Sequence, residues 1–530
     1  MTHGVTVEVD ESRIDALFAS IATSHSPGAA VGIAVDGLPV YRKGFGLASA
    51  ELPLVLSPSM RLRIGSTTKH FTALSTLLSC EAGKARSGDP IRRYVPELHP
   101  VADAVTLLQL MTHTSGLRDV QDIVWQLSGT GRAVGVSELL ALYRDIPDVN
   151  AAPGETWTYN NGGYLLLSVA LERIHGASLE EILRKQIFEP AGMYDTVLRR
   201  WDTDFLPNSA TLHMTGAKGQ YCRSYLGTEL TGEGGIASTV DDMLRWLAHM
   251  DRPRFGSPET WEMLKRPEVL ENGVSTGYGC GLITSRYRGV EILWHPGGVM
   301  GGNAQMLKVP AARLDIVVLV NRHDILGMAL ANQILDACLP GLDPLPAQGS
   351  GWPLVCRVFR SPTTGRVIQL SRKHDEQLVA IDGDEMPFVR DPEGALRPSP
   401  VWGFVRQQLI LTGDQQNPDG LLFEDFGNRD TLVAVEPSAD ADAAAVAGRY
   451  VSSSTGTHME IGPLEDGARL ESHGRFGSTA YRLEPLSKDI WRARSEGAMP
   501  WGGILVFAGA RESFRWSTGR NRGLVFTREP

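Results

Sequence analysis

The chain has 530 residues, of which 42% are apolar, so it is long enough to bury several hydrophobic cores. Its 61 acidic and 51 basic residues give a net charge of -10 without a basic block, which argues against nucleic acid as a partner. No run reaches the roughly eighteen apolar residues of a membrane helix, and the first residues lack a signal-peptide pattern. We therefore expect a cytoplasmic protein without a membrane partner.

The first chemically informative segment is a Ser-x-x-Lys tetrad, Ser66 to Lys69, which opens a predicted apolar helix. Residues three apart on a helix share a face, so the Lys69 amine can reach the Ser66 hydroxyl and take its proton. The tetrad alone is also compatible with a capped helix that carries a solvated lysine. It therefore predicts a serine nucleophile only in combination with further residues.

A second motif, Tyr159-Asn160-Asn161, follows a turn-rich stretch and precedes a predicted helix over residues 164–175. A phenol placed there can relay a proton beside the serine and lysine, and the Asn161 amide can bind both a substrate carbonyl and the lysine. Taken alone, Tyr159 would be read as an ordinary interface aromatic.

A third motif, His295-Pro296-Gly297-Gly298, follows a predicted strand over residues 290–294. Gly297 would let a substrate backbone approach closely, and His295 would offer a donor or a positive charge to a substrate carbonyl or to Tyr159. A lone histidine at this place would instead be read as structural.

The ordered triple Ser-x-x-Lys, Tyr-x-Asn and His-x-Gly resembles the penicillin-recognising serine hydrolases, which include class C β-lactamases, D-alanyl-D-alanine carboxypeptidases, esterases and D-aminopeptidases of the peptidase S12 type. The segments 107–117, 187–193 and 234–243 are similar to flanking regions of that family. In many members a lysine of the third motif grips the free carboxylate of the substrate. His295 stands in that position here, which favours the esterase and aminopeptidase branches.

The resemblance implies an α+β catalytic domain, an antiparallel sheet flanked by helices, over residues 1–340. Residues 340–351 have linker composition, and the pattern then changes to short strands with turn signals. A second linker over 437–445 divides this region. We therefore predict two small antiparallel β-barrels, over residues 352–437 and 446–530.

A catalytic domain followed by two barrels resembles the bacterial D-aminopeptidase branch. In that branch, a loop of the last barrel reaches toward the active site and presents an aspartate to the free amino group of the substrate. The equivalent segment here, residues 494–503, has no aspartate, and Glu496 is its carboxylate. Glu496 is the candidate for binding a substrate ammonium, although an exposed glutamate can also be merely solvated.

The resemblance implies hydrolysis of N-terminal D-Ala-like residues from peptides, amides and esters through an acyl-Ser66 intermediate. Lys69 would be the base, Tyr159 the acid and His295 an electrostatic partner, while Asn161, Gly297 and Glu496 would bind a substrate with a free D-amino terminus. It also implies inhibition by β-lactams and a homodimer. The alternatives are a class C-like esterase or broad amidase, and a catalytically silent ligand-binding protein.

The five cysteines are scattered and show no Cys-x-x-Cys spacing: Cys80, Cys222, Cys280, Cys338 and Cys356. They predict reduced core thiols without a disulfide framework or zinc site. We expect no metal and no cofactor.

Overall fold

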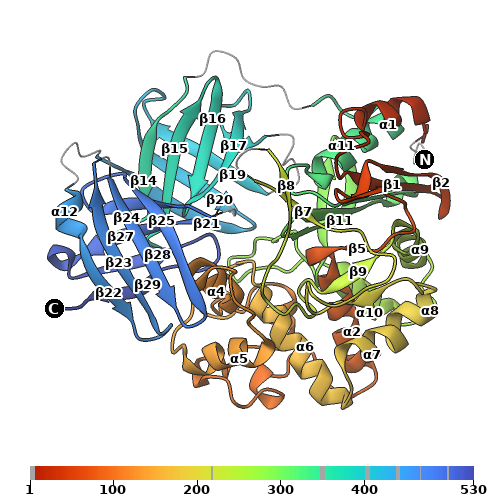
Figure 1. The fold of residues 1–530 in the computed structure, drawn as a ribbon, viewed down its shortest axis with the longest axis horizontal. Helices are drawn as coiled ribbons and strands as arrows, with labels where there is room; N and C mark the ends of the chain where they lie inside the picture. Colours follow the sequence, from red (N-terminus) through yellow and green to blue (C-terminus); the bar gives the residue numbers. More distant parts are fainter. Residues whose placement is uncertain are drawn as a thin grey trace.

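The computed structural model describes residues 6–216, 219–345, 353–399, 406–436, 442–465, 467–497 and 501–530. A mixed α/β region comes first in the chain, and two β-barrels lie side by side next to it (Figure 1). This is the α+β fold with two antiparallel barrels that the sequence predicts. In the described residues, no helix is both long and apolar enough to cross a membrane. All five cysteines are free thiols.

The central sheet of the first region has six antiparallel strands in the order β10-β11-β12-β13-β1-β2. They are β1 (Ala29–Val35), β2 (Leu38–Phe45), β10 (Ile283–Tyr287), β11 (Val290–Val299), β12 (Gly302–Val309) and β13 (Leu314–Val320). The strands β1 and β13 are buried almost throughout. A sheet with such a centre must be covered on both faces.

Helices pack on both faces of the sheet, and alternate residues of one strand contact the helices on opposite faces. On β13, Ile316 and Val318 pack into the core that contains α11 (Gly327–Cys338) and α1 (Glu11–Leu17). The intervening Val317 and Leu319 belong to the core that contains α9 (Val240–Asp251). This division follows from the two-residue period of a strand, which sends successive side chains to opposite faces.

The second core also holds a helical region inserted between β2 and β10. Its longest members are α6 (Asn161–His175) and α2 (Lys69–Glu81), and α2 is buried on nearly all sides. The other helices are α3 (Leu107–Met111), α4 (Val120–Ser128), α5 (Val136–Asp145), α7 (Leu179–Leu183), α8 (Glu189–Ala191) and α10 (Pro258–Lys265). Short strands connect them: β3 (Leu47–Ser49), β4 (Leu52–Val55), β5 (Leu62–Arg63), β6 (Val197–Leu198), β7 (His213–Thr215), β8 (Tyr221–Arg223) and β9 (Ile236–Ser238).

Each barrel closes with eight antiparallel strands in sequence order. The middle barrel comprises β14 (Arg357–Arg360), β15 (Val367–Lys373), β16 (Glu376–Ile381), β17 (Asp384–Arg390), β18 (Leu396–Pro398), β19 (Gln407–Gly413), β20 (Pro418–Asp425) and β21 (Asn428–Val435). The last barrel comprises β22 (Gly448–Ser452), β23 (Thr457–Leu464), β24 (Gly467–Gly474), β25 (Gly477–Pro485), β26 (Ile490–Ser495), β27 (Gly502–Ala508), β28 (Ser513–Ser517) and β29 (Leu524–Arg528). A short helix, α12 (Ala443–Val446), precedes it. Buried side chains such as Tyr481, Trp491 and Trp516 fill its interior, as expected for a small barrel.

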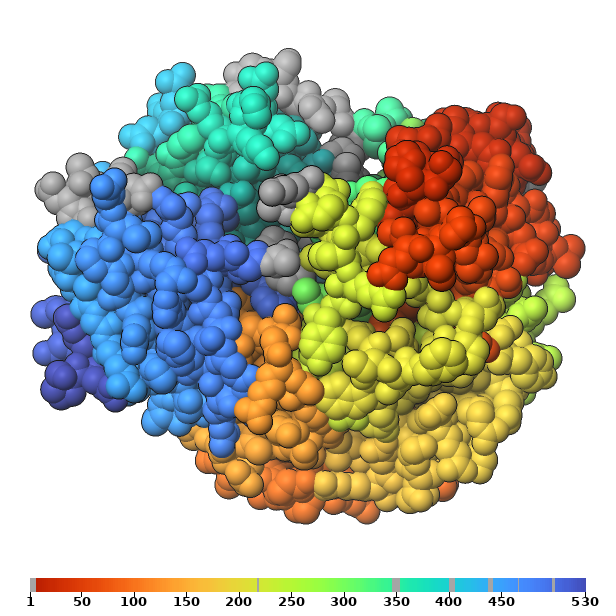
Figure 2. Space-filling model, in the orientation of Figure 1, coloured from red at the N-terminus to blue at the C-terminus, as the bar shows by residue number. Residues whose placement is uncertain are grey.

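The last barrel packs directly on the helical region. The Tyr481 hydroxyl donates to the Gln126 carbonyl at 2.7 Å, and the Ser472 hydroxyl donates to the Leu127 carbonyl at 2.8 Å. Both carbonyls belong to α4. In the space-filling view, the blue surface of this barrel adjoins the orange surface of the helical region (Figure 2).

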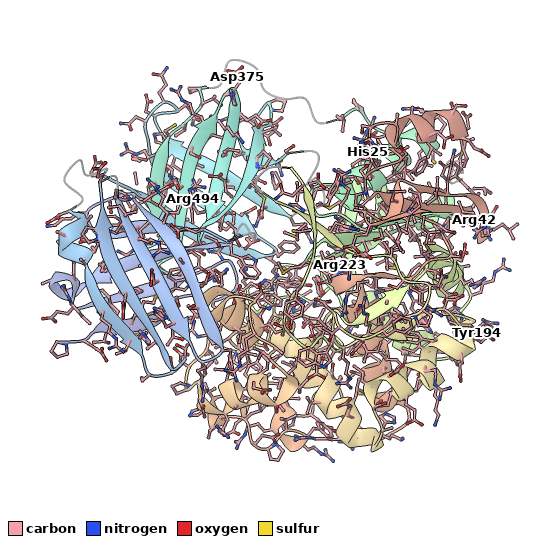
Figure 3. All side chains as sticks on the ribbon, viewed as in Figure 1. His25, Arg42, Tyr194, Arg223, Asp375 and Arg494 are labelled. Atoms are coloured by element: carbon pink, nitrogen blue, oxygen red, sulfur yellow. The ribbon has the colours of Figure 1, made fainter. Side chains whose placement is uncertain are left out.

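The two barrels also contact each other, and the middle barrel contacts the mixed α/β region. Arg494 of the last barrel lies between them, pairing with Glu484 at 2.9 Å and with Glu385 of the middle barrel at 3.6 Å (Figure 3). Phe426 of the middle barrel stacks on Trp157, with ring centroids 4.0 Å apart. Since Trp157 lies two residues before Tyr159, the middle barrel borders the predicted Tyr-x-Asn loop.

Candidate active site

Ser66 lies in a tight turn, η1 (Gly65–Thr68), that runs directly into α2 at Lys69. The strand β11 passes close to this turn. Gly65 has φ +51°, and a Cβ there would stand 2.7 Å from the Gly298 nitrogen. A Cβ on Gly297 would stand 1.8 Å from the Ile64 carbonyl oxygen. Gly297 is therefore required for backbone packing against the turn that presents Ser66.

Lys69 connects three parts of the site from a fully buried position. Its Nζ lies 3.1 Å from the Ser66 Oγ, 2.8 Å from the Asn161 Oδ1 and 2.7 Å from the Glu233 carbonyl oxygen. A neutral amine can donate to the amide and carbonyl oxygens and still accept the Ser66 proton with its lone pair. The contacts therefore match a lysine that works as a base.

Burial lowers the pKa of Lys69 to about 7, the largest of several influences on this group. The negative charges of Glu233 and Asp119 raise the pKa, while the positive charge of Arg520 lowers it. A large fraction of the amine is consequently neutral near pH 7.

Tyr159 joins this group from the loop before α6. Its hydroxyl is close enough to Ser66 for their hydrogen bonding to lower its pKa, but burial is the larger influence and raises the pKa overall. The Lys69 Nζ lies 4.8 Å from the centre of the Tyr159 ring. The phenol therefore stays protonated at neutral pH and can donate a proton. The structure thus brings Ser66, Lys69, Tyr159 and Asn161 together.

The Tyr159 loop is held by Asp119, which sequence reasoning missed. The Asp119 carboxylate is fully buried and accepts hydrogen bonds from the backbone N–H of Asn161 at 3.0 Å and of Gly162 at 3.2 Å. These are N–H groups at the start of α6, which has no internal partners for them. Asp119 is also the N-cap residue of α4, a local role that an Asp before a helix can signal, but nothing in the sequence places Asp119 beside Asn161.

His295 occupies a different position from the one predicted. It is buried, and its Nε2 lies 3.0 Å from the Tyr278 hydroxyl, whereas the prediction gave it a substrate carbonyl or Tyr159 as partner. Burial lowers the pKa of His295 to about 3, so the ring is neutral and brings no positive charge to the site.

The hydrogen bonds around His295 fix a direction for the protons. The Asn160 N–H donates to His113 Nδ1 at 3.2 Å, so His113 carries its proton on Nε2 and donates it to the Tyr278 oxygen at 3.1 Å. Tyr278 then donates to His295 Nε2, and His295 Nδ1–H donates to the Pro296 carbonyl at 2.7 Å. This assignment gives both imidazoles and the Tyr278 hydroxyl a partner for each of their protons. His295 therefore supports the wall of the site behind Tyr159, whose ring centroid lies 4.4 Å from that of His113.

Glu496 is not joined to these residues by its contacts. Among the described residues, its carboxylate pairs with Arg469 at 3.0 Å and its N–H donates to the Ala480 carbonyl, both in the last barrel. The side chains of the pair are each about 40% exposed. Substrate binding by Glu496 gains no support from these contacts and stays a prediction. Residues 498–500 of the same segment lie outside the described residues.

Another connection of the last barrel, residues 518–523 between β28 and β29, does reach the site. Asn521 exchanges hydrogen bonds with the backbone of Asp119, accepting from its N–H at 2.9 Å and donating to its carbonyl at 3.0 Å. The Thr518 hydroxyl donates to the Asp122 carboxylate at 2.8 Å. Arg520, between these anchors, places its guanidinium carbon 5.1 Å from the centre of the Tyr159 ring. The sequence offers no signal for this contact, because about 360 residues separate Tyr159 from Arg520.

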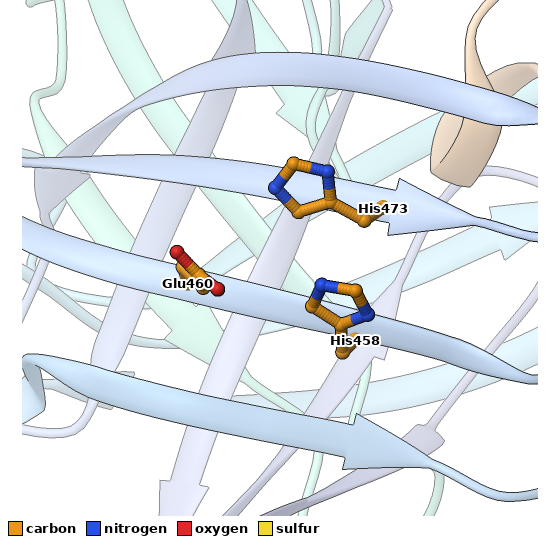
Figure 4. Close-up of side chains that lie close together, drawn as sticks. All are labelled: His458, Glu460 and His473. Atoms are coloured by element: carbon orange, nitrogen blue, oxygen red, sulfur yellow. The ribbon is translucent and has the colours of Figure 1, made fainter.

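A cluster of metal-ligating side chains lies elsewhere, on neighbouring strands of the last barrel (Figure 4). The ligand atoms of His458, Glu460 and His473 all lie within 4.8 Å of one another. The two imidazoles are stacked, with ring planes 18° apart. Because a metal binds in the plane of an imidazole, one ring would have to turn before both could hold a single ion.

A cavity of about 650 Å³ separates β10 from the middle barrel. Its lining includes Arg286, Asp391 and Phe426, but none of the predicted site residues. The candidate site is therefore identified by Ser66 and the residues that contact it. This cavity is a separate feature of the molecule.

Comparison with protein families matches residues 14–337 to the family described as Beta-lactamase. A D-aminopeptidase of Cereibacter sphaeroides is 25% identical over 489 residues, which cover 89% of each chain. A D-aminopeptidase of Gluconobacter oxydans is 28% identical over 331 residues, which cover 62% of each chain.

Among solved structures, an octameric penicillin-binding protein homologue from Pyrococcus abyssi matches with a TM-score of 0.57 and 21% identity, covering 98% of this chain and all of that one. A D-amino acid amidase from Ochrobactrum anthropi matches with a TM-score of 0.52 and 21% identity, covering 62% of this chain and 98% of that one. At these identities the structural matches speak for the fold.

Proposed function

Because this chain belongs to the Beta-lactamase family, we propose that it is a serine hydrolase that cleaves amides, peptides and esters of D-amino acids through an acyl-Ser66 intermediate. The observation that carries the proposal is the contact of Lys69 with Ser66 at 3.1 Å from a fully buried position. A buried lysine with a pKa near neutrality and a serine in reach is a base and nucleophile pair.

Acylation begins when the neutral Lys69 accepts the Ser66 proton and the Ser66 Oγ attacks the substrate carbonyl. The backbone N–H groups at the start of α2, including that of Ser66, are the candidates for stabilising the oxyanion. Asn161 holds the Lys69 amine through its Oδ1 and presents the rest of its amide to the substrate.

The leaving amine needs a proton, and Tyr159 is the donor we propose. Its hydroxyl is beside Ser66 and stays protonated at neutral pH. The Lys69 ammonium then returns the proton that it took to the Tyr159 phenolate, because the acylated Ser66 oxygen has no proton to relay. Water, activated by the same pair, hydrolyses the acyl-enzyme and restores Ser66. His295 takes no proton in this scheme and acts as a positioning residue.

The D-configuration of the acyl residue is supported by the D-aminopeptidases that match most of the chain. We extend this to D-Ala-like N-terminal residues, to β-lactams as acylating inhibitors of Ser66, and to a homodimer. Among the described residues, the predicted partner of the free amino group, Glu496, is paired with Arg469. That pairing favours a second candidate, an esterase or broad amidase indifferent to the amino group.

The test is hydrolysis of D-Ala-p-nitroanilide compared with its L-enantiomer and its N-acetylated form. We expect preference for the D-enantiomer, and Ser66→Ala should abolish turnover of every substrate while the circular dichroism spectrum stays unchanged. Indifference to chirality and to acetylation would support the esterase. Turnover by Ser66→Ala would reject the mechanism, and failure of any activated ester to acylate Ser66 would leave a ligand-binding protein.

A further inference from the structure

Residues 518–523 of the last barrel are built into the wall of the candidate active site. Asn521 also donates to the Asp122 carboxylate at 2.7 Å. The Asn150 side chain donates to the Arg520 carbonyl at 2.7 Å and accepts from the Arg522 N–H at 3.0 Å. Asn521 and Thr518 are buried. The backbone on both sides of Arg520 is therefore fixed to the catalytic domain, and its side chain has a defined place.

The Arg520 guanidinium retains unused hydrogen-bonding capacity. Among the described residues, its hydrogen bond is made by Nη1, to the Asp119 carboxylate at the long distance of 3.4 Å. Asp119 already accepts from the Asn161 and Gly162 N–H groups, so it cannot satisfy a five-donor group as well. The Arg520 side chain is 32% exposed. A ligand can therefore reach the remaining donors.

Arg520 also supplies a charge that the rest of the site lacks. The third motif of the family commonly carries a lysine, whereas His295 is buried and neutral. The Lys69 amine is occupied by Ser66, Asn161 and Glu233. Arginine stays charged at all physiological pH values and binds carboxylates through two parallel hydrogen bonds.

The position of Arg520 indicates which part of a substrate it would meet. Its guanidinium lies 5.1 Å from the centre of the Tyr159 ring, and Tyr159 is the group that we propose protonates the leaving amine. A group next to Tyr159 therefore borders the leaving half of the substrate rather than the acyl half.

We propose that Arg520 is a specificity-determining residue that binds a carboxylate on the leaving residue. The substrate class is then a short D-aminoacyl peptide whose leaving residue has a free carboxyl terminus. This inference rests on the proposed function and names the substrate of the same site.

The experiment compares D-alanyl-glycine with D-alanyl-glycinamide, whose leaving residues end in a carboxylate and in an uncharged amide, and includes D-Ala-p-nitroanilide as a reference with an uncharged leaving group. We expect kcat/KM to be about 10- to 100-fold higher for the carboxylate, the range for a hydrogen-bonded charge. Added salt should reduce this ratio.

Three variants assign the preference to Arg520. Compared at about pH 9, where Lys69 is neutral with or without Arg520, Arg520→Gln should remove the preference mainly by raising KM for D-alanyl-glycine, while the amide and the anilide keep their kcat/KM within about threefold. Arg520→Lys should restore part of the preference. The matched control is Arg449→Gln, which removes an exposed arginine of the same barrel that pairs with Glu529 and should change nothing.

The outcomes separate this inference from the proposed function. Hydrolysis of the neutral D-substrate without a preference for the carboxylate would reject the role of Arg520 and leave the serine hydrolase intact. If Arg520→Gln lowered kcat/KM equally for D-alanyl-glycine and D-alanyl-glycinamide, the contact between Arg520 and Asp119 would have a structural role and not a role in substrate choice. Failure to hydrolyse any D-substrate would reject the proposed function itself.

Discussion

Lys69 and Arg520 are two cations near the same aromatic ring, and their environments give them opposite chemistry. Their charged groups lie 4.8 Å and 5.1 Å from the centre of the Tyr159 ring. Lys69 is fully buried in a helix of the region that matches the Beta-lactamase family, and burial lowers its pKa to about 7. Arg520 comes from the last barrel and keeps a third of its side chain exposed. Burial thus lowers the pKa of Lys69 so that its amine can accept a proton, while the intrinsic basicity of the guanidinium and the nearby Asp119 and Asp122 carboxylates keep Arg520 charged.

The largest effect is expected when Lys69 is replaced by a side chain that cannot lose its proton. Lys69→Arg keeps the positive charge but removes the base, so kcat should fall by about 10²- to 10⁴-fold. The measurement is steady-state turnover of D-Ala-p-nitroanilide. Activity close to that of the unchanged enzyme would mean that another group deprotonates Ser66.

The coupling between the two cations can be read from the pH dependence. Activity on a neutral substrate requires neutral Lys69, so kcat/KM should rise with pH through about 7. The positive charge of Arg520 lowers the pKa of Lys69, so Arg520→Gln should raise it and move this acidic limb to higher pH by about half a unit to one unit. If the acidic limb of the kcat/KM profile stayed at the same pH in Arg520→Gln, the guanidinium charge would be screened from Lys69.

The anchoring of the loop that carries Arg520 is tested by Asn521→Ala. This change removes the hydrogen bonds to Asp119 and Asp122 and leaves the buried Asp119 N–H without its partner, at a cost of about 1–3 kcal/mol of unfolding free energy. Denaturant unfolding measures the loss. KM should rise more for D-alanyl-glycine than for D-alanyl-glycinamide. Equal changes in KM for the two substrates would mean that the position of this loop does not affect carboxylate binding.

The smallest effect is expected at Glu496, the residue of the same barrel that the sequence favours for substrate binding. Because its carboxylate pairs with Arg469 at the surface, Glu496→Gln should change kcat/KM by less than about twofold on free-amine and acetylated substrates alike. A selective loss on the free-amine substrate would restore its predicted role.

Particular residues show which parts of the structure the sequence patterns predicted. The Ser66–Lys69 spacing and the Tyr-x-Asn motif predicted residues that do meet, because each pair is held by the local geometry of one helix start. The alternating pattern after residue 352 predicted the two antiparallel barrels. The His-x-Gly motif predicted a histidine that faces a substrate carbonyl or Tyr159, whereas His295 is buried and lies within hydrogen-bond distance of Tyr278.

The sequence by itself determined which elements form and which residues could carry acyl transfer, since helix and strand periodicity and three-residue spacing are local properties. The tertiary structure decided the rest. It lowered the pKa of Lys69 by burying it, neutralised His295 by the same means, and brought Arg520 of the last barrel to the ring of Tyr159. Burial and contacts across hundreds of residues depend on how domains pack, and no spacing along the chain encodes them.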